Sequence, residues 1–252
     1  MARRFSIRFT SRWRAAPRWA KLAFAAAALI GAAFLVNWLY QVVRKPAELF
    51  FPVSGVLHKT PTQTWTQYAP LFREHSTAVI TPELLAALAQ VEASGNPVAR
   101  TYWRWRLTHE PFEIYRPASS AVGMYQITDG TYREAKRYCV RDHAVVEDGP
   151  WHEWESCWFN WTYLRVVPSH AVEMTSTLLD RQVASIAKQA TPSQKQDLAA
   201  VIHLCGFAGG RAYAARGFRA APGQRCGDHD LRGYLARVNA MKRAFARLAA
   251  LG

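Results

Sequence analysis

The sequence predicts a mostly α-helical domain behind one N-terminal transmembrane helix. Residues 21–43 carry no charge after Lys21 and match the roughly 20 apolar residues that cross a bilayer. Farther along, apolar residues at spacings of three and four predict helices over 82–93 and 231–251. We therefore divide the 252 residues into a basic tail (1–20), a transmembrane helix (21–43), a linker (44–70) and one domain (71–252).

Basic residues flank the apolar segment unequally and orient it. Seven precede or begin it, whereas only Arg44 and Lys45 follow it closely. The positive-inside rule then places the N-terminus in the cytoplasm and the domain in the periplasm, as a single-pass protein of the inner membrane. A cleavable signal peptide is the alternative. Against it, the apolar run exceeds the roughly 7–15 residues of a signal core, and no small-x-small cleavage site follows.

The net charge of +14 does not indicate a nucleic-acid-binding protein. Nine of the 32 basic residues lie in the first 45 positions, which contain no acid, so the remainder has 23 basic against 18 acidic residues. The basic tail suits the membrane surface. The moderate positive charge of the domain suits an anionic wall polymer, and equally a merely soluble surface.

The four cysteines all follow the predicted membrane span. An even number in an oxidising compartment favours disulfides, with three possible connectivities. We expect the local pairing, Cys139 with Cys157 and Cys205 with Cys226. No CxxC occurs, which argues against zinc, and we predict no metal and no cofactor.

The helix over 82–93 carries the most informative residue. Thr81 as N-cap, Pro82 at the first position and Glu83 in the first turn predict its start. Its apolar residues place Glu92 at the C-terminal end, beside the buried face. Such a carboxylate is either a solvated last-turn glutamate or a partly desolvated acid that stays protonated for catalysis.

The surroundings of Glu92 favour the catalytic interpretation. Residues 92–99 (EASGNPVA) resemble the first motif of the lytic transglycosylase catalytic domain, and residues 120–127 (SAVGMYQI) resemble its second. A weaker match, 230–238 (DLRGYLARV), resembles a segment near the end of that domain. The resemblance covers roughly residues 81–238 and implies a lysozyme-like helical fold of the soluble lytic transglycosylase type.

The resemblance also implies a mechanism. Most glycosidases use two carboxylates, but we find only one well-placed acid. The implied reaction needs only one, because the N-acetyl group and the C6 hydroxyl of N-acetylmuramic acid act in place of a protein nucleophile and water. Glu92 would serve first as acid and then as base, leaving a 1,6-anhydro sugar.

Four further residues are candidates for substrate binding. Gln126 would hydrogen-bond sugar substituents, unless its amide caps the adjacent turn. Ser120 would bond to Glu92 or a sugar, unless it is only a small turn residue. Tyr234 would, by its family position, lie near the acid and help hold the N-acetyl group. Tyr125 replaces a family methionine and is either a contact or buried packing.

The chain departs from the family pattern in two places. Residues 100–118 form a longer connection than usual, with Trp103 and Trp105 alternating with arginines, and these two rings are candidates for glycan or partner contact. The family's Ala-Tyr-Asn-Ala-Gly is Cys-Gly-Phe-Ala-Gly at 205–209, so Phe207 replaces the expected asparagine. The other tryptophans, Trp151, Trp154, Trp158 and Trp161, recur at helical spacing and are expected to be mainly core.

The sequence therefore predicts a membrane-anchored enzyme that cleaves the bond between N-acetylmuramic acid and N-acetylglucosamine. Its predicted partners are peptidoglycan glycan strands and the cytoplasmic membrane, with an envelope-spanning machine left open and nucleic acid excluded. A muramidase that uses water and a non-catalytic wall-binding or scaffold protein are the alternatives.

Overall fold

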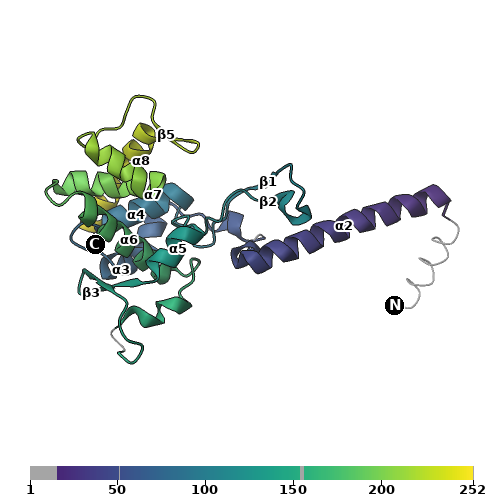
Figure 1. Ribbon diagram of the computed structural model, residues 1–252, viewed down its shortest axis with the longest axis horizontal. Coiled ribbons are helices and arrows are strands. Elements are labelled where there is room, and N and C mark those ends of the chain that lie inside the picture. Colours follow the sequence, from purple (N-terminus) through teal and green to yellow (C-terminus); the bar gives the residue numbers. More distant parts are fainter. Residues whose placement is uncertain (1–15, 51, 154–155, 252) are drawn as a thin grey trace. The chain divides into compact units, whose positions relative to one another are not determined.

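The computed structural model describes residues 16–50, 52–153 and 156–251, and the chain forms two compact units (Figure 1). Unit 1 comprises Met1–Glu48 and Trp103–Pro117, and unit 2 comprises Leu49–Tyr102 and Ala118–Gly252. Most of the predicted basic tail lies outside the described residues. Most of the connection between the two sequence motifs, residues 103–117, therefore belongs to unit 1, whereas both motifs belong to unit 2.

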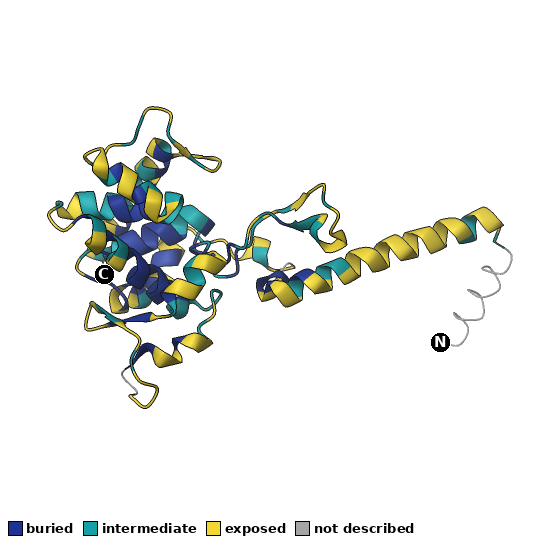
Figure 2. Cartoon of the chain, viewed as in Figure 1, coloured by how far each residue is buried: buried dark blue, intermediate teal, exposed yellow. Residues whose placement is uncertain are grey.

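Unit 1 is built on one long apolar helix. Helix α2 runs from Arg18 to Arg44 and contains the segment predicted to span a membrane. Most of its surface is exposed within the described chain (Figure 2). Two short antiparallel strands, β1 (Trp103–Trp105) and β2 (Tyr115–Pro117), and the 3₁₀ turn η3 (Pro111–Glu113) complete the unit. The 3₁₀ turn η1 (Pro46–Phe50) spans the boundary between the two units in the sequence.

Unit 2 is mostly helical. Its helices are α3 (Pro61–Glu74), α4 (Pro82–Ala93), α5 (Asp129–Ala135), α6 (Pro168–Ile186), α7 (Pro192–Ala215) and α8 (Leu231–Ala250). Two antiparallel hairpins accompany them, β3 (Tyr138–Arg141) with β4 (Ala144–Glu147), and β5 (Arg225–Cys226) with β6 (His229–Asp230). The 3₁₀ turns η2 (Ser54–Val56) and η4 (Cys157–Thr162) lie in the connections.

Helix α4 forms the centre of unit 2 and begins and ends as predicted. The hydroxyl of Thr81 accepts from the backbone N–H of Leu84, and Pro82 occupies the first helical position. The helix is buried on every side from Leu84 to Ala89, rather than along one stripe. A helix that is apolar all round belongs in a core, and the small alanines allow α3 and α8 to approach it closely.

Part of the segment predicted to be a linker, from residue 61 to residue 70, is helical. Helix α3 begins at Pro61, where Thr60 and Gln63 form a reciprocal capping box. Its residues Trp65, Tyr68 and Phe72 are buried in the core of unit 2. Helix α3 therefore belongs to unit 2, although its polar residues hide its apolar face in the sequence.

The C-terminal amphipathic helix is confirmed as α8, with Leu231, Tyr234, Val238 and Phe245 buried. Asp230 caps its N-terminus through the backbone N–H of Gly233. Helix α7 is also long and apolar enough to cross a membrane, but its segment from Leu198 to Ile202 is buried in the core. We treat α7 as a core helix.

Both predicted disulfides are present. Cys139 pairs with Cys157, which joins β3 to η4, and Cys205 pairs with Cys226, which joins α7 to β5. Two disulfides and an apolar N-terminal helix, whether signal or anchor, suggest a secreted or membrane-anchored extracytoplasmic protein.

The expectation that the second tryptophan cluster is mainly core is wrong for the described members. Trp151, Trp158 and Trp161 are 69%, 40% and 61% exposed, on a turn and on η4. Their spacing resembles a helical stripe, but a short 3₁₀ turn has no continuous buried face. Trp154 lies outside the described residues.

Candidate functional site

The structure brings Glu92 and Tyr234 into direct contact. Glu92 occupies the last turn of α4, and Tyr234 comes from the first turn of α8, 142 residues later. The Tyr234 hydroxyl donates to Glu92 Oε1 at 2.6 Å. Tyr234 thus lies beside Glu92.

Burial fixes the protonation state of this tyrosine. Burial and the adjacent Glu92 raise the pKa of Tyr234 well above its ordinary value, so the ring keeps its proton and acts as a donor. Glu92 itself is 16% exposed at its side chain. With Oε1 occupied by Tyr234, Oε2 is the oxygen that can carry a proton to a ligand.

A histidine that sequence reasoning did not place here is the third member of the group. His203 of α7 has its Nε2 at 3.7 Å from Glu92 Oε1, and its side chain is 13% exposed. Because it lies far along the chain from both motifs, only the tertiary fold, in which α7 packs against α6 and α8, reveals its relation to Glu92.

The loop after Glu92 explains the small residues of the first motif. Ser94 and Gly95 both have positive φ, and Gly95 N–H bonds to the Ala89 carbonyl, closing the helix in a Schellman-type end. A side chain on Gly95 would collide with Thr64 of α3. Asn96 is fully buried, donates to the Ser54 carbonyl and accepts from the N–H of Val98. These residues hold the loop and do not face a ligand.

The second motif forms a tight turn that packs against the first. Gly123 has φ +79°, and a Cβ there would lie 2.3 Å from the carbonyl oxygen of Arg165 and 3.2 Å from that of Pro97. Only glycine allows this approach. Met124 is fully buried, as expected for a core residue.

Gln126 both caps its own turn and borders a cavity, so it combines the two roles considered for it. Its backbone has φ +49°, and its Nε2 donates to the Gly123 carbonyl at 2.9 Å, which is the turn-capping role. The side chain also borders a cavity, where its Oε1 remains as an acceptor. Gln126 can therefore be held rigidly by its own turn while it offers an oxygen to a ligand.

The structure does not support Tyr125 and Ser120 as direct substrate contacts. Tyr125 adjoins the cavity, but its side chain is fully buried and its hydroxyl donates to the Leu85 carbonyl. Ser120 accepts from the N–H of Asp129 at the start of α5 and is not among the residues that line the cavity. Both residues order the turn that carries Gln126.

The cavity beside Gln126 has a volume of about 350 Å³ and lies between the Gln126 turn, α5, α6 and α7. Its polar lining includes Gln126, Thr131, Glu134, Gln182 and His203. Glu92 is not part of this lining and is linked to the cavity through His203. Glu134 is a carboxylate in this lining that the sequence did not indicate, because nothing in its local pattern distinguishes it from an exposed helical residue.

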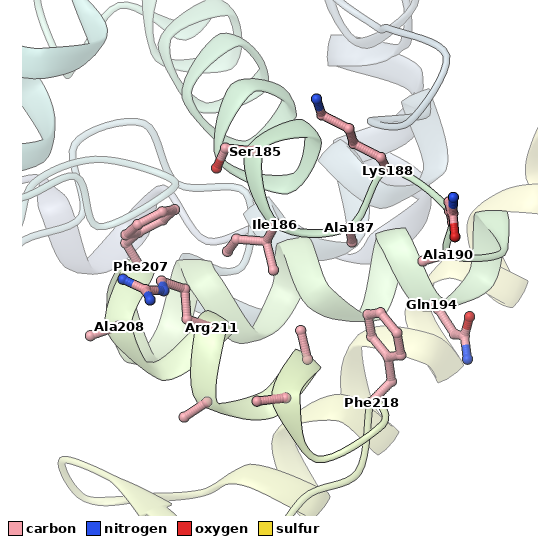
Figure 3. A pocket seen from close by; sticks show the side chains of 14 residues that line it. Ser185, Ile186, Ala187, Lys188, Ala190, Gln194, Phe207, Ala208, Arg211 and Phe218 are labelled. Carbon is pink, nitrogen blue, oxygen red and sulfur yellow. The ribbon is translucent and has the colours of Figure 1, made fainter.

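A larger and more open hollow, of about 1210 Å³, lies where α6 ends against α7 (Figure 3). Lys188, Arg211 and Phe218 are among the side chains that border it. Neither Glu92 nor Gln126 lines it, so its size alone does not make it the reaction site. Phe207, which replaces the family asparagine, borders both cavities and is 40% exposed.

Helix α7 is interrupted between these cavities. Gly206 has φ +73° and ψ 173°, which breaks the helix directly after the disulfide-bonded Cys205. The break turns Phe207 toward both cavities, while His203 remains on the preceding helical segment beside Glu92. Among the residues described, no group of three or more His, Cys, Asp or Glu side chains is arranged to hold a metal ion.

Comparisons with protein families, curated proteins and solved structures found no match to this chain. The fold described above is therefore established only as a mostly α-helical unit with an N-terminal apolar helix.

Proposed function

We propose that this protein is a membrane-anchored peptidoglycan lytic transglycosylase with a lysozyme-like catalytic domain. The observation that carries the proposal is the hydrogen bond from Tyr234 to Glu92. The resemblance to the family predicted that these two residues meet, although 142 residues separate them. A chance likeness of three short motifs gives no reason for such a contact.

Glu92 supplies the acid and the base in this mechanism. Its Oε2 donates a proton to the glycosidic oxygen between N-acetylmuramic acid and N-acetylglucosamine as that bond breaks. The muramic acid N-acetyl oxygen assists at the anomeric carbon. The Glu92 carboxylate then takes the proton from the C6 hydroxyl, whose oxygen displaces the N-acetyl oxygen and closes the 1,6-anhydro ring. No water and no cofactor is consumed.

Side chains beside Glu92 and in the two cavities would assist this reaction. Tyr234 donates to Oε1 and so stabilises the carboxylate after it has lost its proton. His203, 3.7 Å from the same oxygen, borders the cavity and presents a polar edge to the sugar. Gln126 offers Oε1 to a sugar hydroxyl or amide N–H. Lys188 and Arg211 of the larger hollow suit the carboxylates of peptide stems on the glycan.

The proposal includes the location of the enzyme. Helix α2 would cross the inner membrane once, with the arginine-rich N-terminus in the cytoplasm. Unit 2 would then face the periplasm, where peptidoglycan lies and where both disulfides can form. An envelope-spanning machine that needs a local opening in the wall is a further partner in this proposal.

Glu92→Gln tests the chemistry, and Glu83→Gln on the same helix is the matched control. The purified chain is incubated with sacculi, and the soluble products are analysed by mass. We expect the Glu92 variant to lose on the order of a hundredfold to ten-thousandfold in rate, because an amide cannot transfer the proton. The Glu83 variant should keep its activity. Binding to sacculi with no released fragments from the native chain would instead favour a non-catalytic wall-binding or scaffold protein.

Glu134 gives one specific reason to keep a muramidase as the second candidate. It is a carboxylate at the cavity that His203 and Gln126 line, and a hydrolase uses a second carboxylate as nucleophile or to activate water. Glu134→Gln should leave a transglycosylase active and disable a hydrolase. Product ends provide an independent test, since anhydro ends indicate the transglycosylase and reducing ends the hydrolase.

A further inference from the structure

The insertion between the two motifs packs against the C-terminal part of α2. Asn37 Nδ2 donates to the Tyr115 carbonyl at 2.7 Å, and Gln41 Nε2 donates to the Phe112 carbonyl at 2.6 Å. Arg44 forms an ion pair with Glu113. These three residues of α2 recur at spacings of four and three, so they lie on one face of the helix.

Aromatic rings extend the same contact toward the middle of α2. Phe34 meets Trp105 and Tyr115 edge to face, with ring centroids 6.3 Å and 6.1 Å apart. Trp105 stacks on Tyr115, and Tyr40 of α2 stacks on Phe112. The segment Trp103–Pro117, here called the anchor hairpin, is thus ordered on the helix and is not a free loop.

The position of the contact along α2 corresponds to a membrane boundary. A helix rises about 1.5 Å per residue, so about 20 residues cross the roughly 30 Å hydrocarbon layer. Counted from Lys21 at the start of the predicted span, the far boundary falls near Gln41. The anchor hairpin contacts α2 from Phe34 to Arg44 and therefore brackets that boundary.

The exposed side chains of the anchor hairpin are of the kinds that favour such a boundary. Leu107 is fully exposed, Trp105 is 66% exposed, and Ile114 is 39% exposed. Two exposed arginines, Arg104 and Arg106, alternate with the tryptophans. Tryptophan and tyrosine are enriched at membrane interfaces, and arginine binds phosphate there.

We propose that the anchor hairpin is a second membrane-docking element, whose tip around Trp105 and Leu107 enters the headgroup layer of the periplasmic leaflet and prefers anionic phospholipid. We choose lipid over a protein or glycan partner because the hairpin packs directly on α2, the helix proposed to cross the membrane. The amide groups of Asn37 and Gln41, which would be costly to expose near hydrocarbon, already have hairpin carbonyls as acceptors. The inference rests on the membrane anchorage in the proposed function and is independent of the chemistry of Glu92.

Photo-crosslinking of the full chain tests this placement. A photoreactive amino acid replaces Leu107 at the hairpin tip, Leu29 in the middle of α2, or Leu251, an exposed leucine of unit 2. Each variant is reconstituted in vesicles of phosphatidylethanolamine and phosphatidylglycerol, and adducts are identified by mass. We expect abundant lipid adducts at positions 29 and 107 and at least tenfold fewer at position 251. An Arg104→Gln/Arg106→Gln background should reduce the phosphatidylglycerol share of the adducts at 107.

The three positions separate the possible failures. No lipid adduct at 29 would refute the membrane anchorage of the proposed function. If lipid adducts form at position 29 but those at position 107 do not exceed the background at position 251, only the docking of the hairpin is overturned. The 107 variant is also irradiated in wall-containing envelopes. There, glycan or protein adducts in excess of lipid adducts would overturn the inference in favour of that partner. Sacculus cleavage by the same preparations reports separately on the enzymatic proposal.

Discussion

Tyr234 and Glu92 join the start of α8 to the end of α4 through a hydrogen bond of 2.6 Å that is shielded from water on the tyrosine side. Tyr125 provides a natural comparison. It is equally buried and also uses its hydroxyl in one hydrogen bond, but to the backbone carbonyl of Leu85. Comparing the two tyrosines therefore separates the effect of the hydrogen bond to Glu92 on the site from the effect of a buried tyrosine hydrogen bond on stability.

We predict different outcomes for Tyr234→Phe and Tyr125→Phe. Each substitution keeps the ring and removes one buried hydrogen bond, so each should lower the free energy of unfolding by about 1–2 kcal/mol. Only Tyr234→Phe should also slow sacculus cleavage, by about tenfold or more, because Glu92 loses its donor. Thermal melts and rates measured well below the melting temperature provide the check. Equal rates for both variants would remove Tyr234 from the site.

The turn that carries Gln126 should not tolerate a side chain at Gly123. Gly123→Ala combines φ +79° with a Cβ 2.3 Å from the Arg165 carbonyl oxygen, and we expect a loss of at least about 2 kcal/mol. Gly130→Ala in α5 is the control, since its Cβ meets nothing within 4 Å. It should stabilise the protein by up to about 1 kcal/mol. Chemical denaturation measures both, and a neutral Gly123→Ala would contradict the described turn.

Removal of either disulfide should lower stability by a similar amount, but only one of the two removals should reduce activity. They close loops of similar length, with sequence separations of 18 and 21, so removal of either pair by Cys→Ser should cost about 3 kcal/mol. Cys205 precedes the break in α7 and lies two residues from His203. Removal of Cys205–Cys226 should therefore reduce cleavage at temperatures where the protein is still folded. Removal of Cys139–Cys157 should reduce only the melting temperature.

Buried tyrosines should make the protein sensitive to alkali. Burial raises the pKa of Tyr213 to about 12, and raises the pKa values of Tyr125 and Tyr234 well above the ordinary value. A folded pKa above the unfolded one means that the folded state holds its protons more tightly, so this stability is complete below about pH 10 and is lost as pH rises further. The melting temperature should fall above pH 10. In Tyr234→Phe the free energy of unfolding should fall less steeply with pH in this range, by about 1.4 kcal/mol per pH unit.

The sequence was informative wherever a local rule decides the structure. Thr81 and Pro82 specify the start of α4, the apolar spacing specifies α8, and the local cysteine pairing follows from short loops. Relations set by packing could not be predicted in the same way. His203 meets Glu92 only through the tertiary arrangement of the helices, and the buried face of α3 is masked by its polar residues. The spacing of Trp151, Trp158 and Trp161 resembles that of an α-helix, but a short 3₁₀ turn does not continue this period.

The anchor hairpin gives the chain an attachment that does not depend on one covalent link. The backbone passes between the units at Glu48–Leu49, at Tyr102–Trp103 and at Pro117–Ala118. A protease that cut the chain within Ser54–Val56 would sever only the first passage. The strands at 103–117 would still belong to the outer fragment and would still be bonded to α2 through Asn37, Gln41 and Arg44. Shedding the domain from its anchor would therefore require breaking a packed interface as well as a peptide bond.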